Sequence, residues 1–407
     1  MKHSLALLAL LGLITFLLSF DTDRPTAPTE THPKVVNKDT SVVLQDTTFL
    51  GFERLFQQNL KKNGCPGAAL VIVKDTTVLV MNGYGVRDIT TEDSVDVSTA
   101  FRIGSVSKGF AGILTGILTQ STDLDWESRV KDVLPSFALS DSLQTNRIEV
   151  RHLLSHTVGL PRHSYTNLIE DGKSLDEIIP MLKGVNLISK EGRMMSYQNV
   201  TFSIIEKVSE SFTNKSFDKL LREKIFDAAN MQNASTSYQD ILSTSNRAEP
   251  HYYNSRDKKY HKSRITRKYY NTIAAGGINA SIEDMGNWLQ VLLGNTEVIS
   301  KAALDSVFTS EVNTSRNRKY FNRWPGVKKS YYAKGWRLID FGSREIVYHG
   351  GYVNLYRSEI AVDRENRIAI CALFNAPTKY SGKVIPTFFN YCDSLTMNNN
   401  RVSSTIN

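Results

Sequence analysis

Two groups of strand-like runs, one early and one late in the chain, most constrain what this sequence can fold into. The early runs cover residues 68–73 and 78–82, and the late runs cover residues 344–348, 355–362 and 367–374. Helical periodicity fills most of the sequence between them. Short turns such as residues 363–366 join the late runs, which indicates antiparallel pairing. We therefore predict an α+β fold in which both ends of the chain build one antiparallel sheet flanked by helices, and the middle builds a helical lobe.

A Ser-x-x-Lys tetrad, Ser105 to Lys108, opens one of the helix-like segments. The same spacing occurs at Ser128 to Lys131, Ser216 to Lys219 and Ser255 to Lys258, so spacing alone does not identify a site. Only the tetrad at Ser105 precedes a run of small and apolar residues with helical spacing, whereas the others lie among charges. A serine in the first turn of a helix meets free backbone N–H groups and the helix dipole, which favour a developing negative charge. Ser105 is therefore the candidate nucleophile.

Two further residues are candidates for handling the proton of Ser105. Lys108 lies three residues on, hence on the same helix face, and a lysine can accept a proton when burial or another cation lowers its pKa. A tyrosinate beside that lysine would serve equally well. The pattern Tyr-x-Asn recurs in this chain, but Tyr197 is singled out because it ends an irregular stretch and leads into an apolar-periodic helix. Asn199 then offers a side-chain amide for orienting a substrate.

A His-x-Gly triplet occurs once, at His349 to Gly351. Its two glycines lie among strand-like residues and indicate a strand that another backbone or a ligand approaches very closely. A histidine with an ordinary pKa is mostly neutral at pH 7.

Together and in this order, the three motifs resemble those of the serine β-lactamase and penicillin-binding-protein superfamily, on the side of class C β-lactamases, D-alanyl-D-alanine carboxypeptidases and family VIII esterases. The resemblance covers about residues 46–395. Segments outside the motifs also carry it: residues 66–69 with 83–88, residues 153–161, and residues 274–281. The fold implied is the β-lactamase/penicillin-binding-protein type, with the active site in the cleft between the sheet and the helical lobe.

The resemblance implies a role for each candidate residue. Ser105 would form the acyl-enzyme, Lys108 and Tyr197 would share proton transfer, and Asn199 would contact a substrate amide. His349 would stand where many lactamases carry a lysine.

The resemblance also implies an oxyanion hole. It would be formed by the backbone N–H of Ser105 and that of Tyr352, which follows Gly351. The candidate substrate-binding residues are thus Asn199, His349, Gly351 and Tyr352.

The third motif departs from Lys-Thr-Gly or Lys-Ser-Gly, since it lacks the permanent cation and the hydroxyl that would hold a substrate carboxylate. This favours a peptidase or esterase over an efficient β-lactamase. The predicted function is a serine hydrolase that acts on an ester, a D-amino-acid peptide or a β-lactam. The alternative is a catalytically silent relative that binds peptidoglycan or a partner protein through the same cleft. His156, a lone histidine in a leucine-rich run, is interpreted as structural.

Composition agrees with an enzyme of this size. The 407 residues are 41% hydrophobic and 22% charged, enough for one large core or two joined lobes. The net charge of +8 is spread along the chain, and the basic, tyrosine-bearing stretches 256–268 and 316–329 are interpreted as solvated loops, so no nucleic-acid partner is expected. Cys65, Cys371 and Cys392 show no metal-ligand spacing, and we predict no metal, no cofactor and no disulfide framework. We expect a monomer acting on a small molecule or a peptidoglycan peptide.

The N-terminus predicts the compartment. Residues 1–20 contain an apolar run behind Lys2 and read as a signal sequence or a short membrane anchor. Residues 21–45 are predicted to be a disordered linker. Residues 46–395 form the hydrolase domain, with a sheet lobe at 46–104 and 270–395 and a helical lobe at 105–269, and residues 396–407 form a polar tail. An extracytoplasmic location, periplasmic or secreted, is expected, with inner-membrane association as the alternative in which the N-terminal segment is retained.

Overall fold

The computed structural model describes residues 47–315 and 324–404. The predicted N-terminal segment, the linker at 21–45 and most of the basic stretch 316–329 lie outside the described residues. The boundaries drawn between a sheet lobe and a helical lobe stay predictions.

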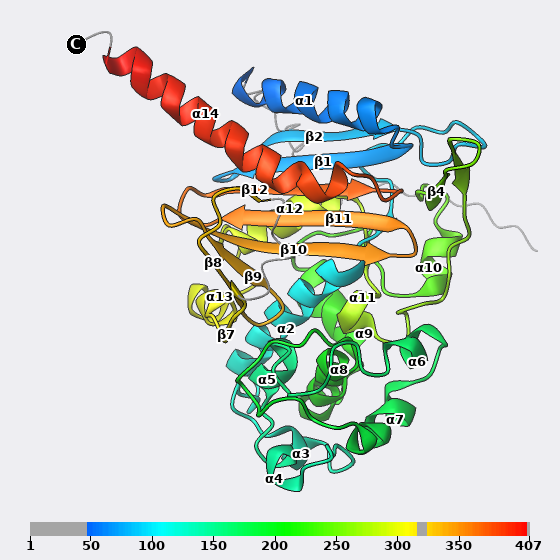
Figure 1. The fold of residues 1–407 in the computed structure, drawn as a ribbon, viewed down its shortest axis with the longest axis vertical. Coiled ribbons are helices and arrows are strands. Elements are labelled where there is room, and N and C mark those ends of the chain that lie inside the picture. The colour runs from blue at the N-terminus through cyan, green and yellow to red at the C-terminus, as the bar shows by residue number, and fades with distance from the viewer. Residues whose placement is uncertain (1–46, 316–323, 405–407) are drawn as a thin grey trace, which may run out of the picture. The chain divides into compact units, whose positions relative to one another are not determined.

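The centre of the fold is an antiparallel sheet whose described strands run in the order β2-β1-β12-β11-β10-β9-β8-β7 (Figure 1). The early strands β1 and β2 pair with each other, and β1 pairs with β12 from Ala68 opposite Phe374 to Lys74 opposite Ile368. The strand bounds are β1 Gly67–Lys74, β2 Thr77–Gly85, β7 Val312–Asn313, β8 Lys329–Tyr332, β9 Arg337–Asp340, β10 Glu345–Val353, β11 Tyr356–Asp363 and β12 Ile368–Phe374. The predicted joining of the two chain ends in one antiparallel sheet is confirmed.

Both faces of the central strands β1 and β12 are buried, which explains why these two strands read as continuous apolar runs. Along β1, Ala69, Val71 and Val73 belong to one core cluster. Ala68, Leu70 and Ile72 belong to the other. Successive side chains of a strand point to opposite faces, so each cluster takes alternate residues. A sheet covered by helices on both sides has no polar face.

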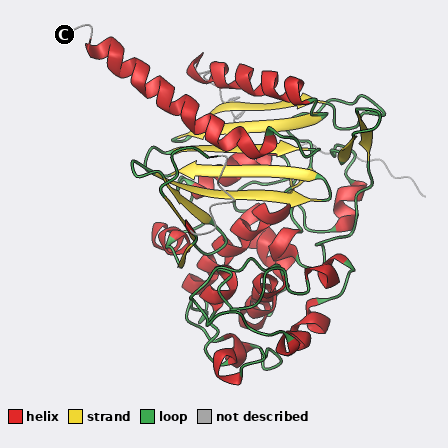
Figure 2. Ribbon diagram, in the orientation of Figure 1, coloured by secondary structure: helices red, strands yellow, loops and turns green. Residues whose placement is uncertain are grey.

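Different helices cover the two faces. The cluster on one face includes Phe52 and Phe56 of α1 and Phe388 of α14, whereas α2, α8 and α12 contribute to the cluster on the other (Figure 2). The helix bounds are α1 Thr47–Asn63, α2 Ser107–Ser121, α3 Val130–Val133, α4 Ser142–Thr145, α5 Val150–Leu154, α6 Thr166–Glu170, α7 Leu175–Ile178, α8 Val200–Thr213, α9 Phe217–Leu221, α10 Tyr238–Ser243, α11 Ile273–Gly276, α12 Ile282–Leu292, α13 Lys301–Phe308 and α14 Val384–Ser404. The helix α14 therefore continues through most of the predicted polar tail.

The helix α2 is the central element of the fold. Its residues from Ser107 to Gly116 are all buried, and the sequence SKGFAGILTG is apolar or small on every side apart from its first two residues. A helix that is apolar all round belongs in a core rather than at a surface. One turn of 3₁₀ helix, Gly104–Val106, leads into it.

Shorter elements complete the fold. Strand β3 (Phe101–Arg102) pairs with β6 (Asn279–Ala280), and β4 (His251–Asn254) forms a hairpin with β5 (Lys259–Lys262). This hairpin differs from the solvated loop expected for the basic stretch 256–268. Its strands carry tyrosines among polar residues, and cross-strand pairs such as Tyr253 with Tyr260 stabilise it. Further 3₁₀ or π turns occur at Ile179–Gly184, Arg222–Phe226 and Ser381–Lys383.

Candidate active site

The structure places Ser105 in the 3₁₀ turn that opens α2, directly after β3. Gly104 before it has a φ of +53°, a left-handed conformation that glycine adopts without strain. Ser105 is half-buried, whereas Val106 and Ser107 after it are buried. The serine hydroxyl is thus accessible at the end of an otherwise enclosed helix.

The tyrosine predicted as proton-transfer partner contacts the serine directly. The Tyr197 hydroxyl donates to Ser105 Oγ at 2.9 Å. Tyr197 lies in the irregular segment before α8, where its carbonyl accepts from the His163 N–H at 3.0 Å. Burial raises the pKa of Tyr197, while the Ser105 hydroxyl and the positive charges of Arg337 and Arg162 act to lower it. The tyrosine can therefore exchange a proton with Ser105.

Lys108 is fully buried, with 0% of its surface exposed. Its Nζ donates to Asn199 Oδ1 at 2.9 Å and to the Ala275 carbonyl at 2.7 Å, and it lies 4.9 Å from the centre of the Tyr197 ring. Burial, and next the positive charge of Arg337, hold the pKa of Lys108 well below that of an exposed lysine. The pair Lys108 and Tyr197 is therefore suited to sharing one transferable proton.

The other Ser-x-x-Lys tetrads have surroundings of a different kind. Lys131 donates to the carbonyls of Pro135 and Phe137 at the surface, and Lys219 is exposed beside Glu223. Ser216 is the N-cap residue of α9. The combination of a half-buried serine and a fully buried lysine is found at Ser105 and Lys108.

The strand that follows His349 lies against the nucleophile turn. A Cβ on Gly351 would collide with the Ile103 carbonyl oxygen and the Ser358 hydroxyl, which explains the glycine. A Cβ on Gly104 would come within 2.9 Å of the Tyr352 backbone nitrogen. The Tyr352 side chain is 53% exposed, so the part of Tyr352 that adjoins the nucleophile turn is its backbone. The predicted close approach at the paired glycines is confirmed.

His349 is 1% exposed, and both of its ring nitrogens have partners. Nδ1 hydrogen-bonds the Gly350 carbonyl at 3.0 Å, and Nε2 hydrogen-bonds the Tyr332 hydroxyl at 3.0 Å. The same hydroxyl meets His156 Nε2 at 3.1 Å. Burial and the charges of Arg337 and Lys108 hold the pKa of His349 well below its ordinary value. The imidazole is therefore neutral at pH 7, and its role in substrate binding stays a prediction.

Asn199 connects the buried lysine with the rim of the site. While Oδ1 accepts from Lys108, Nδ2 donates to the Tyr269 hydroxyl at 3.1 Å. That hydroxyl donates in turn to Glu170 of α6 at 3.2 Å. Burial, followed by the negative charge of Glu170, raises the pKa of Tyr269. A substrate amide that contacts Asn199 would therefore meet Tyr269 as well.

Three contributors were missed by sequence reasoning. Arg337 on β9 lies with its guanidinium carbon 6.0 Å from the Tyr197 ring centre and 5.2 Å from that of Tyr332, and its charge acts on both Lys108 and Tyr197. Tyr269 and the Ala275 carbonyl are the other two. An arginine in a short strand and a backbone carbonyl carry no motif. The resemblance of residues 274–281 to a family signature is the sequence signal that points to Ala275.

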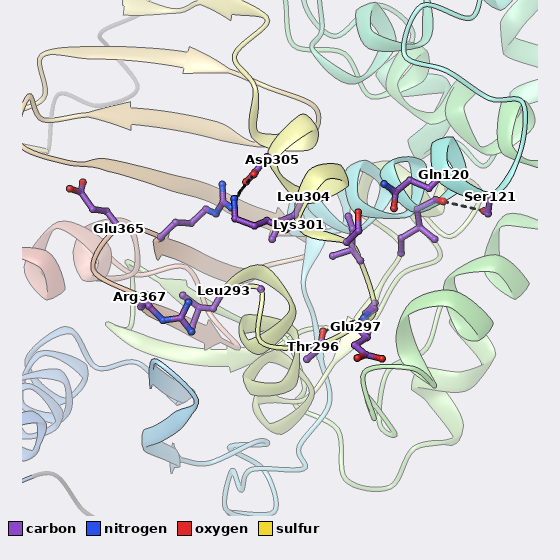
Figure 3. Close-up of a pocket in the computed structure, with 16 residues that line it drawn as sticks. Gln120, Ser121, Leu293, Thr296, Glu297, Lys301, Leu304, Asp305, Glu365 and Arg367 are labelled. Carbon is purple, nitrogen blue, oxygen red and sulfur yellow. Dashed lines mark hydrogen bonds and ion pairs between the residues drawn. The ribbon is translucent and has the colours of Figure 1, made fainter.

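A large pocket of about 990 Å³ lies elsewhere, at the far end of α2 (Figure 3). Its lining includes Gln120 and Ser121 of α2, Lys301 and Asp305 of α13, and Arg367. Since an α-helix rises about 1.5 Å per residue, Ser121 is roughly 24 Å along the helix from Ser105. This pocket is therefore separate from the candidate active site.

No group of three or more His, Cys, Asp or Glu side chains in residues 47–315 and 324–404 is placed to hold a metal ion. No helix in that part of the chain is both long enough and apolar enough to cross a membrane.

Comparison with known proteins agrees with this geometry. The family model described as Beta-lactamase matches residues 52–385, and the chain belongs to this family. Among solved structures, it is similar to an octameric penicillin-binding-protein homologue from Pyrococcus abyssi, with a TM-score of 0.72, 20% identity, and coverage of 83% of this chain and 76% of that one. It is also similar to a D-stereospecific amidohydrolase from Streptomyces sp., with a TM-score of 0.66, 19% identity, and coverage of 81% of this chain and 95% of that one. These likenesses confirm the predicted fold.

The curated relatives are longer than this chain. The unguisins hydrolase ungD' of Aspergillus campestris is 25% identical over 350 residues, which cover 84% of this chain and 64% of the relative. Protein flp of Staphylococcus aureus is 22% identical over 335 residues, 82% of this chain and 64% of flp. The matched region thus spans slightly less than two thirds of these relatives.

Proposed function

We propose that the protein is a serine hydrolase that forms an acyl-enzyme on Ser105. The observation that carries the proposal is the 2.9 Å hydrogen bond between Tyr197 and Ser105 beside a fully buried Lys108. A serine hydroxyl at neutral pH requires such a neighbour to take its proton. In the acylation step, Ser105 Oγ bonds to the substrate carbonyl carbon and its proton passes to the Tyr197–Lys108 pair. The bond between that carbon and the leaving group then breaks, and the pair returns the proton to the leaving group.

The proposed oxyanion hole consists of the Ser105 and Tyr352 N–H groups. Two backbone donors that face one point stabilise the negative oxygen of the tetrahedral intermediate, and loss of one such donor typically costs about 2.7–4 kcal/mol. The close approach of Gly104 to Tyr352 supports this assignment. In deacylation, water attacks the ester carbon and passes a proton to the same Tyr197–Lys108 pair. The bond between that carbon and Ser105 Oγ breaks, the acyl group leaves as the carboxylic acid, and the pair returns the proton to Oγ.

We propose an ester or an amide of a D-amino acid as the substrate class. A neutral His349 offers no permanent charge for the carboxylate that a β-lactam carries. The structural neighbour named a D-stereospecific amidohydrolase supports an amide substrate, and the relative named an unguisins hydrolase supports a hydrolytic reaction.

Labelling with a fluorescent fluorophosphonate and a fluorescent penicillin tests the proposal. Wild-type protein should be labelled and Ser105→Ala should not, whereas Ser128→Ala, which changes another Ser-x-x-Lys tetrad, should label like wild type. Absence of labelling and of p-nitrophenyl ester turnover in wild type would favour a catalytically silent binding protein. Comparing D-alanine and L-alanine p-nitroanilides then tests the substrate class.

A further inference from the structure

A buried chain of hydrogen bonds connects the Tyr197 segment to the strand that bears the candidate oxyanion donor. The Gln198 N–H donates to His156 Nδ1 at 3.2 Å, and His156 Nε2 lies 3.1 Å from the Tyr332 hydroxyl. Tyr332 lies 3.0 Å from His349 Nε2, and His349 Nδ1 lies 3.0 Å from the Gly350 carbonyl. The three side chains come from the loop after α5, from β8 and from β10, and each is no more than 1% exposed.

The two ends of the chain determine where its hydrogens lie. A backbone N–H can only donate, so His156 Nδ1 is the acceptor and its Nε2 carries the hydrogen. A carbonyl can only accept, so His349 Nδ1 carries a hydrogen and its Nε2 accepts from Tyr332. The Tyr332 hydroxyl then accepts from His156 and donates to His349. Every bond of the chain is satisfied when both imidazoles are neutral.

His156 holds the Tyr197 segment at three points. Its carbonyl accepts from the Ser196 N–H at 2.9 Å, its Nδ1 accepts from Gln198, and its ring lies 4.3 Å from the Tyr197 ring between centres. Both residues that flank Tyr197 in sequence are thus bound to His156. This arrangement orients the phenol toward Ser105.

We propose that His156, Tyr332 and His349 form a positioning chain that fixes Tyr197 relative to the oxyanion strand at Gly350–Tyr352, and that it works only while both imidazoles are neutral. The inference rests on the proposed function, because it assigns the chain a role in proton transfer at Ser105. None of the hydrogen bonds in this chain involves Ser105. The chain therefore keeps Tyr197 in place after acylation, when Ser105 Oγ is part of an ester.

The charges around the two imidazoles favour the neutral state. Lys108 of α2 and Arg337 of β9 face both rings, His163 also acts on His156, and Arg357 of β11 also acts on His349. Burial and these positive charges keep the pKa of each imidazole well below its ordinary value. Protonation of either ring would place a second donor against the Gln198 N–H or against the Tyr332 hydroxyl. Activity should therefore fall on the acid side.

Tyr332→Phe tests the chain, because it removes one hydroxyl and keeps the ring. Loss of a hydrogen bond of ordinary strength should lower kcat for a p-nitrophenyl ester about tenfold at pH 8 and change KM less than about twofold. In the profile of kcat against pH, the fall on the acid side should move to higher pH, because the neutral form of His349 loses the hydrogen bond that the Tyr332 hydroxyl donates. Tyr331→Phe, which removes a hydroxyl from the neighbouring position of β8, should behave like wild type.

His349→Gln supplies the second arm. A glutamine side-chain oxygen can accept from Tyr332 in place of Nε2 and does not titrate, so this variant should retain more kcat than His349→Ala, and its acid limb should move to lower pH. Far-UV circular dichroism and thermal melts check folding; if Tyr332→Phe does not fold, the profile of His349→Gln decides.

Each outcome supports or overturns the chain. If Tyr332→Phe has the kcat and the acid limb of wild type, the positioning chain is overturned. Labelling of Ser105 in the wild-type protein would still support the hydrolase function in that case. Equal kcat in His349→Gln and His349→Ala would also overturn the positioning chain. Wild-type protein that is neither labelled nor active would overturn both.

Discussion

Lys108 donates from Nζ to Asn199 Oδ1 at 2.9 Å, so the buried lysine is held by a neutral oxygen. Its second described acceptor, the Ala275 carbonyl, is also uncharged. Neither acceptor offsets the cost of burying a positive charge as a carboxylate would. The buried lysine therefore lowers the stability of the folded protein, and it does so at the site where a proton acceptor is required.

This burial predicts a stability effect of Lys108→Met. The pKa of Lys108 is lowered in the folded state, so the unfolded chain binds more protons and wild-type stability is lost as pH falls below about 10.4. The variant lacks this dependence. Its free energy of unfolding relative to wild type should increase by up to about 1.4 kcal/mol for each pH unit below that value.

Urea unfolding at pH 8, 9 and 10 measures the difference. Lys131→Met, at a partly exposed lysine of another Ser-x-x-Lys tetrad, is the matched control. A constant difference between Lys108→Met and wild type over this range would contradict the prediction. Esterase activity of Lys108→Met should be lost at every pH.

Lys108 and Tyr197 should act as one unit. Lys108→Ala and Tyr197→Phe should each remove most of kcat, because either change breaks the shared proton transfer. The double variant should be little worse than either single variant, as is found for catalytic residues that depend on each other. Steady-state kinetics on one ester measures this, and losses that multiply would show that the two residues act independently.

The neutral His349 predicts a substrate preference. Its imidazole is buried and uncharged at pH 7, so p-nitrophenyl esters should be turned over with a higher kcat/KM than cephalosporins. Both values should be measured on one preparation. Cephalosporin hydrolysis near the usual enzyme range of about 10⁴–10⁸ M⁻¹s⁻¹ would contradict this expectation.

A shortened chain that begins at Asp46 should remain monodisperse and keep full esterase activity. It retains all of α1, and the candidate site residues begin at Ser105. A chain that begins at Gly64 is the contrasting variant, because it lacks Phe52 and Phe56, which are fully buried against the sheet, and it should aggregate. Loss of activity or aggregation of the longer chain would mean that residues 1–45 are needed by the hydrolase domain.

The sequence predicted those parts of the protein that depend on local pattern. The strands β1 and β12 are recognisable because they are continuous apolar runs, and β2 and β11 because each contains a shorter run of apolar residues. Ser105 is recognisable because a buried helix follows it. For β10, the recognisable apolar run ends at Tyr348, but the paired glycines after it also indicated a strand, and the strand does continue to Val353. Glycines weaken intrinsic strand preference, but pairing with β11 extends through Gly350 and Gly351.

The remaining parts depend on contacts between distant segments. His156 and Tyr332 are 176 positions apart, and they meet because of how the loop after α5 packs on β8. The same holds for Arg337, which reaches the site through the register of β9 with β10. The sequence indicates that His156 is a structural group. Its contacts with both neighbours of Tyr197 place that structural group beside the candidate active site.

Mapping the acyl group is the most direct test of the central claim. Wild-type protein should be mixed with a p-nitrophenyl ester, quenched in acid during turnover, digested and analysed by mass spectrometry. The account predicts one acyl adduct, on Ser105. Ester turnover by wild-type protein with the acyl group on a different residue, or undiminished turnover by Ser105→Ala, would contradict it.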